Sequence, residues 1–355
     1  MIRFEPRGEA SAFWTYASPL LAIVLTILGT GLIFRLMGQP PLIAVYTFLV
    51  APLVQAGGLA ALAIKAAPLI LMGAGLALCY RASVWNIGAE GQFTFGAIFA
   101  GGVALALPDA PGALVYPAML LAGMAGGALL AALAAWLRTA LNVSEILSTL
   151  MLNYIAQLML IYLVTGPWKD PHGFGFPQTA MFQDGAVSLE LVAGTGVHLG
   201  CAVAPLAAIA LWVVAAKSML GFQLRVAGEA PRAARFAGFS EPRLIWAAML
   251  ISGAMAGLAG MFEVAGPIQQ LTTEISPGYG YAAVIVAFLG RLHPIGAIFA
   301  GLLLSLSYLG GQAAQIDLGL PNAVTGIFQG ILLFLLLACD ILILYSPRLR
   351  RAAPA

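Results

Sequence analysis

Runs of about twenty residues without Asp, Glu, Lys or Arg recur along the whole chain, and an α-helix needs that length to cross ~30 Å of hydrocarbon. The main charge-free runs are Leu36 to Ile64, Gly91 to Pro108, Ala110 to Leu137, Ile146 to Trp168, Leu191 to Ala216, Leu244 to Phe262 and Leu318 to Cys339. Soluble domains do not carry so many such runs. The sequence therefore predicts a protein that crosses a membrane several times.

The composition agrees with this prediction. Of the 355 residues, 61% are hydrophobic and 8% are charged, against roughly 45–50% and 25% in soluble domains. No ten-residue segments of alternating polarity suggest a β-barrel, so we expect an all-α integral membrane protein. The predicted helices lie near residues 17–37, 43–64, 66–80, 92–107, 112–137, 144–165, 197–216, 244–265, 279–310 (one bent segment or two) and 322–345. They form a polytopic bundle of about eight to ten transmembrane helices.

Lysine and arginine are concentrated in three places. Ten of the 16 lie before residue 8, within 217–243 or after residue 345, and positive charge marks cytoplasmic segments. We therefore expect both termini and the 217–243 loop in the cytoplasm. The 166–196 loop carries three acidic residues against one lysine, so it is expected on the outer face.

Motifs that carry enzyme chemistry do not occur in the sequence. An ATP-hydrolysing chain needs a G-x-x-x-x-G-K-[ST] loop, but none of the three lysines follows a glycine. H-E-x-x-H, C-x-x-C and G-x-S-x-G are also missing, so we expect no catalytic residue and no metal site. Three isolated cysteines, Cys79, Cys201 and Cys339, are expected to pack as small hydrophobic residues.

The segment "RASVWNIGAEGQ", residues 81 to 92, places Asn86, Glu90 and Gln92 just ahead of an apolar run. A charge at the bilayer centre costs on the order of 2.5–3.5 kcal/mol, so such residues usually face a cavity or a partner. The glycines permit an unwound turn, and a helix starting here would present free N–H groups. Two roles remain open: the side chains cap that helix, or they contact solute on the substrate pathway.

A polar stripe follows in "LNVSEILSTLMLNYIAQ", residues 141 to 157. Asn142, Glu145, Thr149, Asn153 and Gln157 are spaced by 3, 4, 4 and 4 residues, which predicts one polar face on a helix. The stripe should face the interior of the bundle. It either lines the substrate pathway or forms an interhelical hydrogen-bond seam worth about 0.6 kcal/mol per contact.

Small residues dominate "GAMAGLAGMFEVAG", residues 253 to 266, which includes the G-x-x-x-G pair of Gly253 and Gly257. This pattern predicts close helix packing. Glu263 is its one candidate functional residue.

The hexapeptide GAIFAG occurs at residues 96–101 and again at 296–301, each time after a polar, Gly-containing break. Six small and apolar residues can recur by chance, but matched broken helices are typical of an internally repeated transporter. His293, before Pro294, is interpreted as a helix-start residue rather than a proton relay.

The 217–243 loop contains "GEAPRAARFAG", residues 228 to 238. Pro231 can begin a short helix, and Glu229 ahead of it suits the N-terminal end of the helix dipole. Arg225, Arg232 and Arg235 then form a basic patch. A plain positive-inside loop is the alternative.

At this point the sequence resembles the permease subunits of bacterial ABC importers for simple sugars and nucleosides, in the group that includes ribose and branched-chain amino-acid permeases. The matching motifs are NIGAEGQ (86–92), VSEILSTLMLNYIA (143–156), GEAPRAARFAG (228–238) and GYGY…LGRLHPIGAIFAG (278–301), in family order. The chain has Ser144 where the family usually has Asn, and Trp85 where it usually has Phe. The first change puts a direct role of position 144 in doubt.

The resemblance implies that residues 1–355 form a single transmembrane permease domain in the bacterial inner membrane, pairing with an identical or related permease. Cytosolic ATPase subunits would bind ATP and Mg, and a periplasmic or lipid-anchored binding protein would deliver the solute. The ATPases would dock through Gly228, Glu229, Arg232 and Arg235. The substrate pathway would be Asn86, Glu90, Gln92, Glu145, Thr149, Asn153 and Gln157. The motifs favour a nucleoside over a free sugar.

The residues alone also allow two functions other than an ABC permease. The first is a proton-coupled secondary transporter, which would use Glu90, Glu145 or Glu263 as its proton relay. The second is a non-transporting membrane scaffold, and the polar stripe argues against it. For the ABC permease we expect transport by alternating access.

Overall fold

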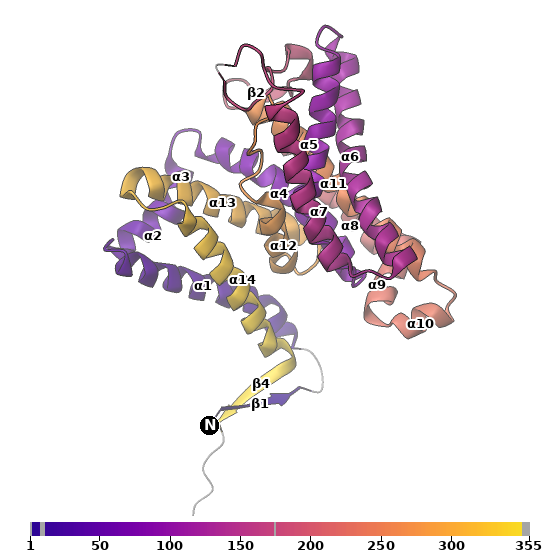
Figure 1. The fold of residues 1–355 in the computed structure, drawn as a ribbon. Helices are drawn as coiled ribbons and strands as arrows, with labels where there is room; N and C mark the ends of the chain where they lie inside the picture. The colour runs from indigo at the N-terminus through magenta and orange to yellow at the C-terminus, as the bar shows by residue number, and fades with distance from the viewer. Residues whose placement is uncertain (1, 8–10, 174, 350–355) are drawn as a thin grey trace, which may run out of the picture. The chain divides into compact units, whose positions relative to one another are not determined.

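Helices account for most of the structure, a computed structural model that describes residues 2–7, 11–173 and 175–349. The helices are α1 (Ala12–Leu36), α2 (Pro41–Leu49), α3 (Ala51–Val54), α4 (Gly58–Arg81), α5 (Ala89–Ala106), α6 (Gly112–Leu141), α7 (Glu145–Thr165), α8 (Leu199–Lys217), α9 (Met219–Glu229), α10 (Pro231–Phe236), α11 (Glu241–Glu263), α12 (Tyr279–Leu289), α13 (Pro294–Leu318) and α14 (Ala323–Leu344). The strands are β1 (Ile2–Pro6), β2 (Glu190–Val192), β3 (Val197–His198) and β4 (Tyr345–Leu349) (Figure 1). Among these described helices, eight are long and apolar enough to cross a membrane. The predicted all-α polytopic fold is confirmed.

The described chain divides into two compact units. One contains residues 1–56 and 306–355, and the other contains residues 57–305, so the division falls within α13. The expectation of one permease domain over residues 1–355 stays a prediction.

In the first unit, α1 packs against α14 and α2. Rings of Phe34, Phe48 and Phe328 form its apolar centre, with Phe48 and Phe328 centroids 5.1 Å apart. The two ends of the chain meet here, because β1 and β4 pair as antiparallel strands.

In the second unit, α11 is the central helix and packs against α4, α5 and α6. Glycines make this close approach possible. A Cβ on Gly257 would lie 2.9 Å from the Gly127 Cα and would also collide with the Gly123 carbonyl, and a Cβ on Gly96 would collide with the Gly257 backbone. The small-residue pattern around Gly253 and Gly257 was interpreted as helix packing, and these contacts agree with it.

The 43–80 region differs from the two helices predicted at 43–64 and 66–80. The chain forms short helices α2 and α3, and α4 then runs without a break from Gly58 to Arg81. Pro41 and Pro52 occupy the first turns of α2 and α3, where a proline is tolerated. Gly57 ends this stretch in the left-handed region, at φ 80°. Hydrophobicity was continuous across these residues, so it could not indicate the interruptions.

Both GAIFAG copies lie in the second member of a broken helix pair. The chain breaks between α4 and α5 at residues 82–88, and between α12 and α13 at residues 290–293. The segment expected at 279–310 is thus two helices rather than one. The breaks have different lengths, and each precedes a helix that contains GAIFAG. The internal repeat stays a prediction.

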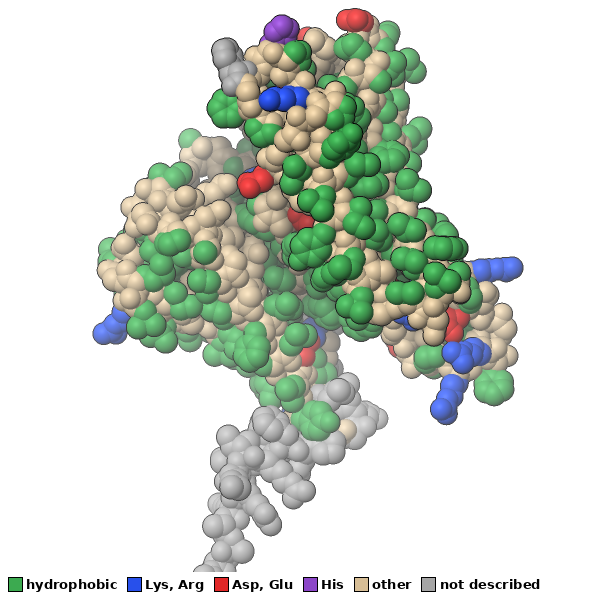
Figure 2. Space-filling view, in the orientation of Figure 1, with side chains coloured by type: hydrophobic (Ala, Val, Ile, Leu, Met, Phe, Trp, Pro, Cys, Tyr) green, Lys and Arg blue, Asp and Glu red, His purple; other side chains and the backbone are tan. Residues whose placement is uncertain are grey.

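The surface carries few charges outside its loops. In the view of Figure 2, hydrophobic side chains cover the surface formed by α6 and α7, and Lys and Arg side chains gather at α9 and α10. This distribution suits a bundle whose sides face lipid and whose loops face water.

Candidate functional site

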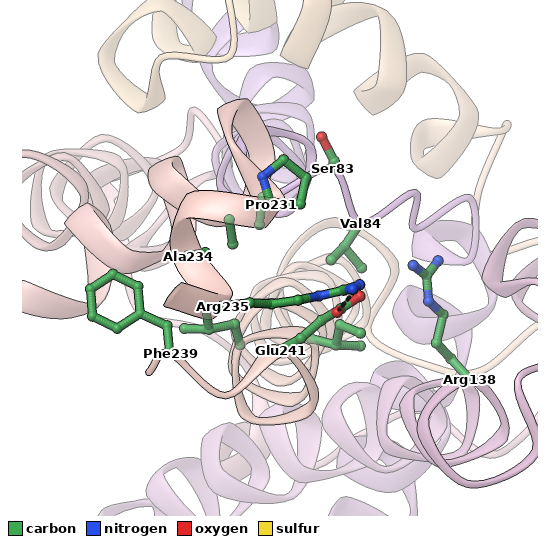
Figure 3. A pocket seen from close by; sticks show the side chains of 12 residues that line it. Ser83, Val84, Arg138, Pro231, Ala234, Arg235, Phe239 and Glu241 are labelled. Atoms are coloured by element: carbon green, nitrogen blue, oxygen red, sulfur yellow. Dashed lines mark hydrogen bonds and ion pairs between the residues drawn. The ribbon is translucent and has the colours of Figure 1, made fainter. Parts of the chain in front are cut away.

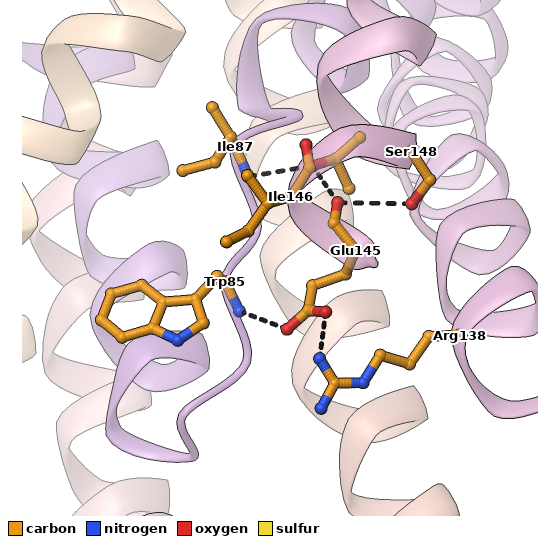
Figure 4. A network of polar contacts seen from close by, with 7 residues as sticks. Trp85, Ile87, Arg138, Glu145, Ile146 and Ser148 are labelled. Atoms are coloured by element: carbon orange, nitrogen blue, oxygen red, sulfur yellow. Dashed lines mark hydrogen bonds and ion pairs between the residues drawn. The ribbon is translucent and has the colours of Figure 1, made fainter. Parts of the chain in front are cut away.

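The polar face of α7 lies against residues 85–88, which precede α5, and against the first turn of α5 (Figure 4). The Trp85 backbone N–H donates to Glu145 Oε1 at 3.2 Å, and the Ile87 N–H donates to Thr149 Oγ1 at 3.2 Å. The other carboxylate oxygen of Glu145 pairs with Arg138. Glu145 is only 3% exposed, so these partners, rather than water, stabilise its negative charge.

Asn153 continues this contact one turn further along α7. Its Oδ1 accepts from the Gly91 N–H at 2.8 Å, and its Nδ2 donates to the Ile87 carbonyl at 3.0 Å. A Cβ at Gly91 would lie 2.8 Å from the Asn153 Cα, so only glycine allows this approach. Gln157, the last member of the stripe, donates to the Thr273 carbonyl at 2.8 Å. The four α7 residues therefore hold the segment before α5, the first turn of α5 and the backbone at Thr273 in place.

Asn86 and Gln92 form a reciprocal amide pair in the core. Asn86 Nδ2 donates to Gln92 Oε1 at 2.9 Å, and Gln92 Nε2 donates to Asn86 Oδ1 at 3.1 Å. Asn86 also donates to Ser252 Oγ on α11 at 3.1 Å and accepts from the Gly88 N–H at 2.9 Å. Asn86 is 0% exposed, and its amide satisfies the turn just before α5. Gly88, the N-cap residue of α5, makes no side-chain capping bond, and the Gly91 N–H in the first turn donates to Asn153 rather than to Asn86 or Glu90.

Glu90 faces the start of α12. Its Oε2 accepts from the Gly280 N–H at 2.6 Å, in the first turn of that helix, where a carboxylate is stabilised by unpaired N–H groups and the helix dipole. A Cβ on Gly280 would collide with the Glu90 backbone. The first turns of α5 and α12 thus meet at Glu90.

Sequence reasoning missed Lys65 in this region. Its Nζ donates to the Tyr279 hydroxyl at 2.7 Å, and Glu263, the last residue of α11, is buried. Placing a lysine inside a long apolar helix costs free energy, so such a residue is a candidate functional residue. That signal was present in the sequence, where Lys65 ends a charge-free run.

One member of the predicted stripe does not lie on α7. Asn142 ends α6 in the left-handed region at φ 53°, and α7 begins at Glu145. Asparagine is common in this conformation after a helix, so its role is to end α6. Ser144 precedes α7 but makes no side-chain capping bond.

The predicted short helix at Pro231 is present as α10, between α9 and α11. Arg235 Nη2 donates to Glu241 Oε2 at 3.0 Å, and Arg225 lies 3.9 Å from Glu229 in an exposed pair. Arg232 is exposed, and Phe236 at the end of α10 is 94% exposed. Phe236 was part of the predicted helix but was not singled out, although an exposed aromatic residue in a charged loop is a sign of a binding surface.

The loop touches the polar segment through α9. Ser83 Oγ donates to the Gly228 carbonyl at 3.3 Å, and a Cβ on Gly228 would lie 3.0 Å from the Arg81 carbonyl carbon. A cavity of about 150 Å³ opens beside this contact. Figure 3 shows Ser83 and Val84 on one side of it and Pro231, Ala234 and Arg235 on another. Of the predicted coupling residues, Gly228 contacts residues 81–83. Within the described part of the chain, Arg232 forms no hydrogen bond or ion pair.

His198 is a buried residue that the sequence did not single out. Its Nδ1 accepts from the Gly200 N–H at 3.2 Å and so caps α8. Burial lowers the pKa of His198 to about 4, which keeps the imidazole neutral at pH 7.

Known proteins resemble this chain over most of its length. Residues 58–337 match the family described as branched-chain amino acid transport system / permease component. A glucose ABC transporter permease of Haloferax volcanii is 33% identical over 96% of this chain and 91% of its own length. A guanosine ABC transporter permease of Bacillus subtilis is 33% identical over 75% of this chain and 77% of its own, and a nucleoside ABC transporter permease of Lactococcus lactis is 28% identical over 89% of both.

These matches do not favour a proton-coupled transporter. Permeases of this family work with ATPase and solute-binding partners, and they are transport components rather than enzymes. Since the family match covers well over half of the chain, this protein belongs to the branched-chain amino acid transport system permease family and is a multi-pass permease subunit of an ABC importer.

Proposed function

We propose that this permease moves a nucleoside across the bacterial inner membrane by alternating access, driven by ATPase subunits that dock on residues 228–238. The nucleoside is supported by the relatives named for guanosine and nucleosides. A simple sugar is the second candidate, because the relative named for glucose matches 96% of the chain.

The proposed orientation places α9, α10 and both termini in the cytoplasm. Five basic residues lie within 217–243, which supports a cytoplasmic loop. The pairing of β1 with β4 supports a common side for the two termini. The 166–196 loop would then face the binding protein on the outer side.

The observation that carries the coupling proposal is the contact of α9 with residues 81–83. Gly228 packs on the backbone of Arg81, and Ser83 donates to the Gly228 carbonyl. Residues 85–91, which follow directly, are held by Glu145, Thr149 and Asn153. Displacement of α9 and α10 by an ATPase would therefore be transmitted along one short piece of backbone to the polar contacts of α7.

The polar residues would serve transport when these contacts open. Asn86, Glu90, Gln92, Glu145, Thr149, Asn153 and Gln157 bond to backbone or to one another in the described state. Separation of residues 85–91 from α7 would expose the polar groups of Glu145, Thr149 and Asn153 to a polar solute. Each group would exchange a hydrogen bond within the protein for one to the solute. The net gain in free energy would be small, so the pathway would bind the solute weakly.

The ATP and Mg needed for transport would be bound by the ATPase subunits, with no cofactor in this chain. The permease would pair with an identical or related permease. A periplasmic or lipid-anchored protein would supply the solute.

Phe236 offers the sharpest test of the docking surface. In the reconstituted transporter, Phe236→Ala and Arg232→Glu should each uncouple ATP hydrolysis from uptake and weaken copurification of the ATPase. Met219→Ala is the matched control, because Met219 is also an exposed hydrophobic residue but begins α9, outside residues 228–238. Arg235→Glu is less clean, since it also breaks the pair with Glu241. Normal coupled uptake in both Phe236→Ala and Arg232→Glu would refute docking on α10.

The solute is tested separately. Uptake of labelled nucleosides, pentoses and glucose should be compared in cells with and without the permease. Uptake of a nucleoside alone supports the first candidate. Uptake of a sugar alone supports the second.

A further inference from the structure

A second cavity, of about 390 Å³, lies where the two helix breaks approach α9. Its walls come from the end of α4, the second half of α9 and the turn after α12. The residues used below are Arg81, Ser83, Arg225, Glu229, Arg291 and His293. None of them belongs to the polar network on α7.

The lining of this cavity is strongly basic. Three arginines, Arg81, Arg225 and Arg291, line it together with one acidic residue, Glu229. Glu229 lies 3.9 Å from Arg225 in an exposed pair, and such pairs contribute little energy. In a chain with 8% charged residues, three arginines on one cavity need an explanation.

The backbone around the cavity is held in costly conformations. Ser83, Arg291 and Leu292 line it with φ of 55°, 58° and 51°. They are three of the five non-glycine residues with positive φ in the described chain. Each such residue costs about 1 kcal/mol or more, and such strain gathers at ligand sites.

Helix ends alone do not account for this arrangement. An arginine in the last turn of α4 stabilises the helix dipole, which explains Arg81. Arg291 lies beyond the end of α12 in the left-handed region, and Arg225 lies in the middle of α9. These three side chains start on different elements and share one cavity.

The cavity also contains His293, whose protonation depends on the charges around it. Burial, and next the charge of Arg81, lower the pKa of His293. Arg225 and Arg291 face the same cavity, and Glu229 is its one acidic group. A bound anion would offset the arginine charges and make protonation of His293 easier.

We propose that this cavity binds a phosphate group. Guanidinium forks match the oxygens of a phosphate, and several of them around one cavity are typical of phosphate sites. The group could be carried by a soluble phosphate monoester or by a phospholipid headgroup. A cytosolic origin of the ligand rests on the orientation proposed above, whereas binding itself does not.

The test uses the purified permease alone, in detergent stripped of phospholipid. Inorganic phosphate and a nucleoside 5′-monophosphate should raise the melting temperature, and the free nucleoside should not. Arg291→Gln should weaken the apparent affinity roughly tenfold, as expected for one charge-assisted contact. Arg243→Gln, an exposed arginine of α11 outside the cavity, is the matched control. Arg225→Gln, on the exposed side of the cavity, serves if Arg291→Gln does not fold.

A second arm identifies the source of the phosphate. Vesicles of phosphatidylcholine with and without phosphatidylglycerol replace the detergent. Stabilisation by phosphatidylglycerol that is lost in Arg291→Gln assigns the site to a lipid headgroup, and stabilisation by the monophosphate assigns it to a soluble ester. The proposal is overturned if neither ligand stabilises the wild type, or if the arginine variants respond as the wild type does. Because no ATPase is present, failure of the transport proposal would not affect this result.

Discussion

Arg138 and Glu145 form an ion pair across the turn that joins α6 to α7. Arg138 lies in the last turn of α6, Glu145 is the first residue of α7, and the left-handed Asn142 brings the two helix ends together. The side chain of Arg138 is 29% exposed, whereas that of Glu145 is 4% exposed. Water can therefore reach Arg138 when Glu145 is replaced, whereas it hardly reaches Glu145 when Arg138 is replaced.

Loss of Arg138 should destabilise the protein more than loss of Glu145. Arg138→Gln leaves a buried carboxylate without its charge partner, at roughly 2–4 kcal/mol, whereas Glu145→Gln leaves a guanidinium that water can reach, at roughly 1–2 kcal/mol. Thermal unfolding of the purified variants measures the difference. The double variant should be more stable than Arg138→Gln alone. Equal losses in both single variants would contradict this account of the pair.

Asn153 should be essential for the shape of the segment it holds. Asn153→Leu removes the acceptor of the Gly91 N–H and the donor to the Ile87 carbonyl, so uptake should fall roughly tenfold or more while the protein still reaches the membrane. Tyr154→Leu is the control, because Tyr154 is the next residue on α7 and is 60% exposed. Normal uptake in Asn153→Leu would leave α7 with a packing role only.

The helical periodicity of α7 was readable from the sequence because every fourth residue repeats a polar side chain. Glu145, Thr149, Asn153 and Gln157 do lie on one face. Apart from Arg138, which pairs with Glu145, their partners could not be read, since these are backbone groups at residues 85–91 and Thr273, more than fifty residues away. Hydrogen bonds to backbone leave no pattern of complementary side chains in the sequence.

The interruptions of the helices were harder to predict than the helices. Residues 43–64 carry no charge and are mostly apolar, so hydropathy predicted one span, although Pro52, Gln55 and Gly57 lie within it. The break at 290–293 was easier, because it contains Gly290, Arg291 and His293 ahead of Pro294. Polar breaks are visible in the sequence, whereas breaks made by backbone conformation alone are not.

Gly257 should tolerate no side chain. Gly257→Ala places a methyl group against the Gly123 carbonyl and the Gly127 backbone, so we expect a loss of about 1–3 kcal/mol from overpacking α11 against α6. Gly326→Ala in α14 is the control, because a Cβ there meets no atom within 4 Å. That substitution should be neutral or stabilise by up to about 1 kcal/mol through helix propensity. Melting temperatures that shift equally in both variants would show that the glycine contact does not limit the packing.

Stability should fall as the pH is lowered from about 6.5 towards 4, because His198 is 2% exposed and neutral in the folded protein. Its folded pKa of about 4 lies below the ordinary value of 6.5, so between these values the unfolded chain binds more protons than the folded one. Stability therefore rises with pH across this window, and at pH 5 the loss should be about 1–2 kcal/mol. His198→Asn keeps an acceptor for the Gly200 N–H but does not titrate, so its melting temperature should depend less on pH than that of the wild type. Melting curves at pH 7 and pH 5 measure the effect, and equal pH dependence in the two proteins would assign it to other groups.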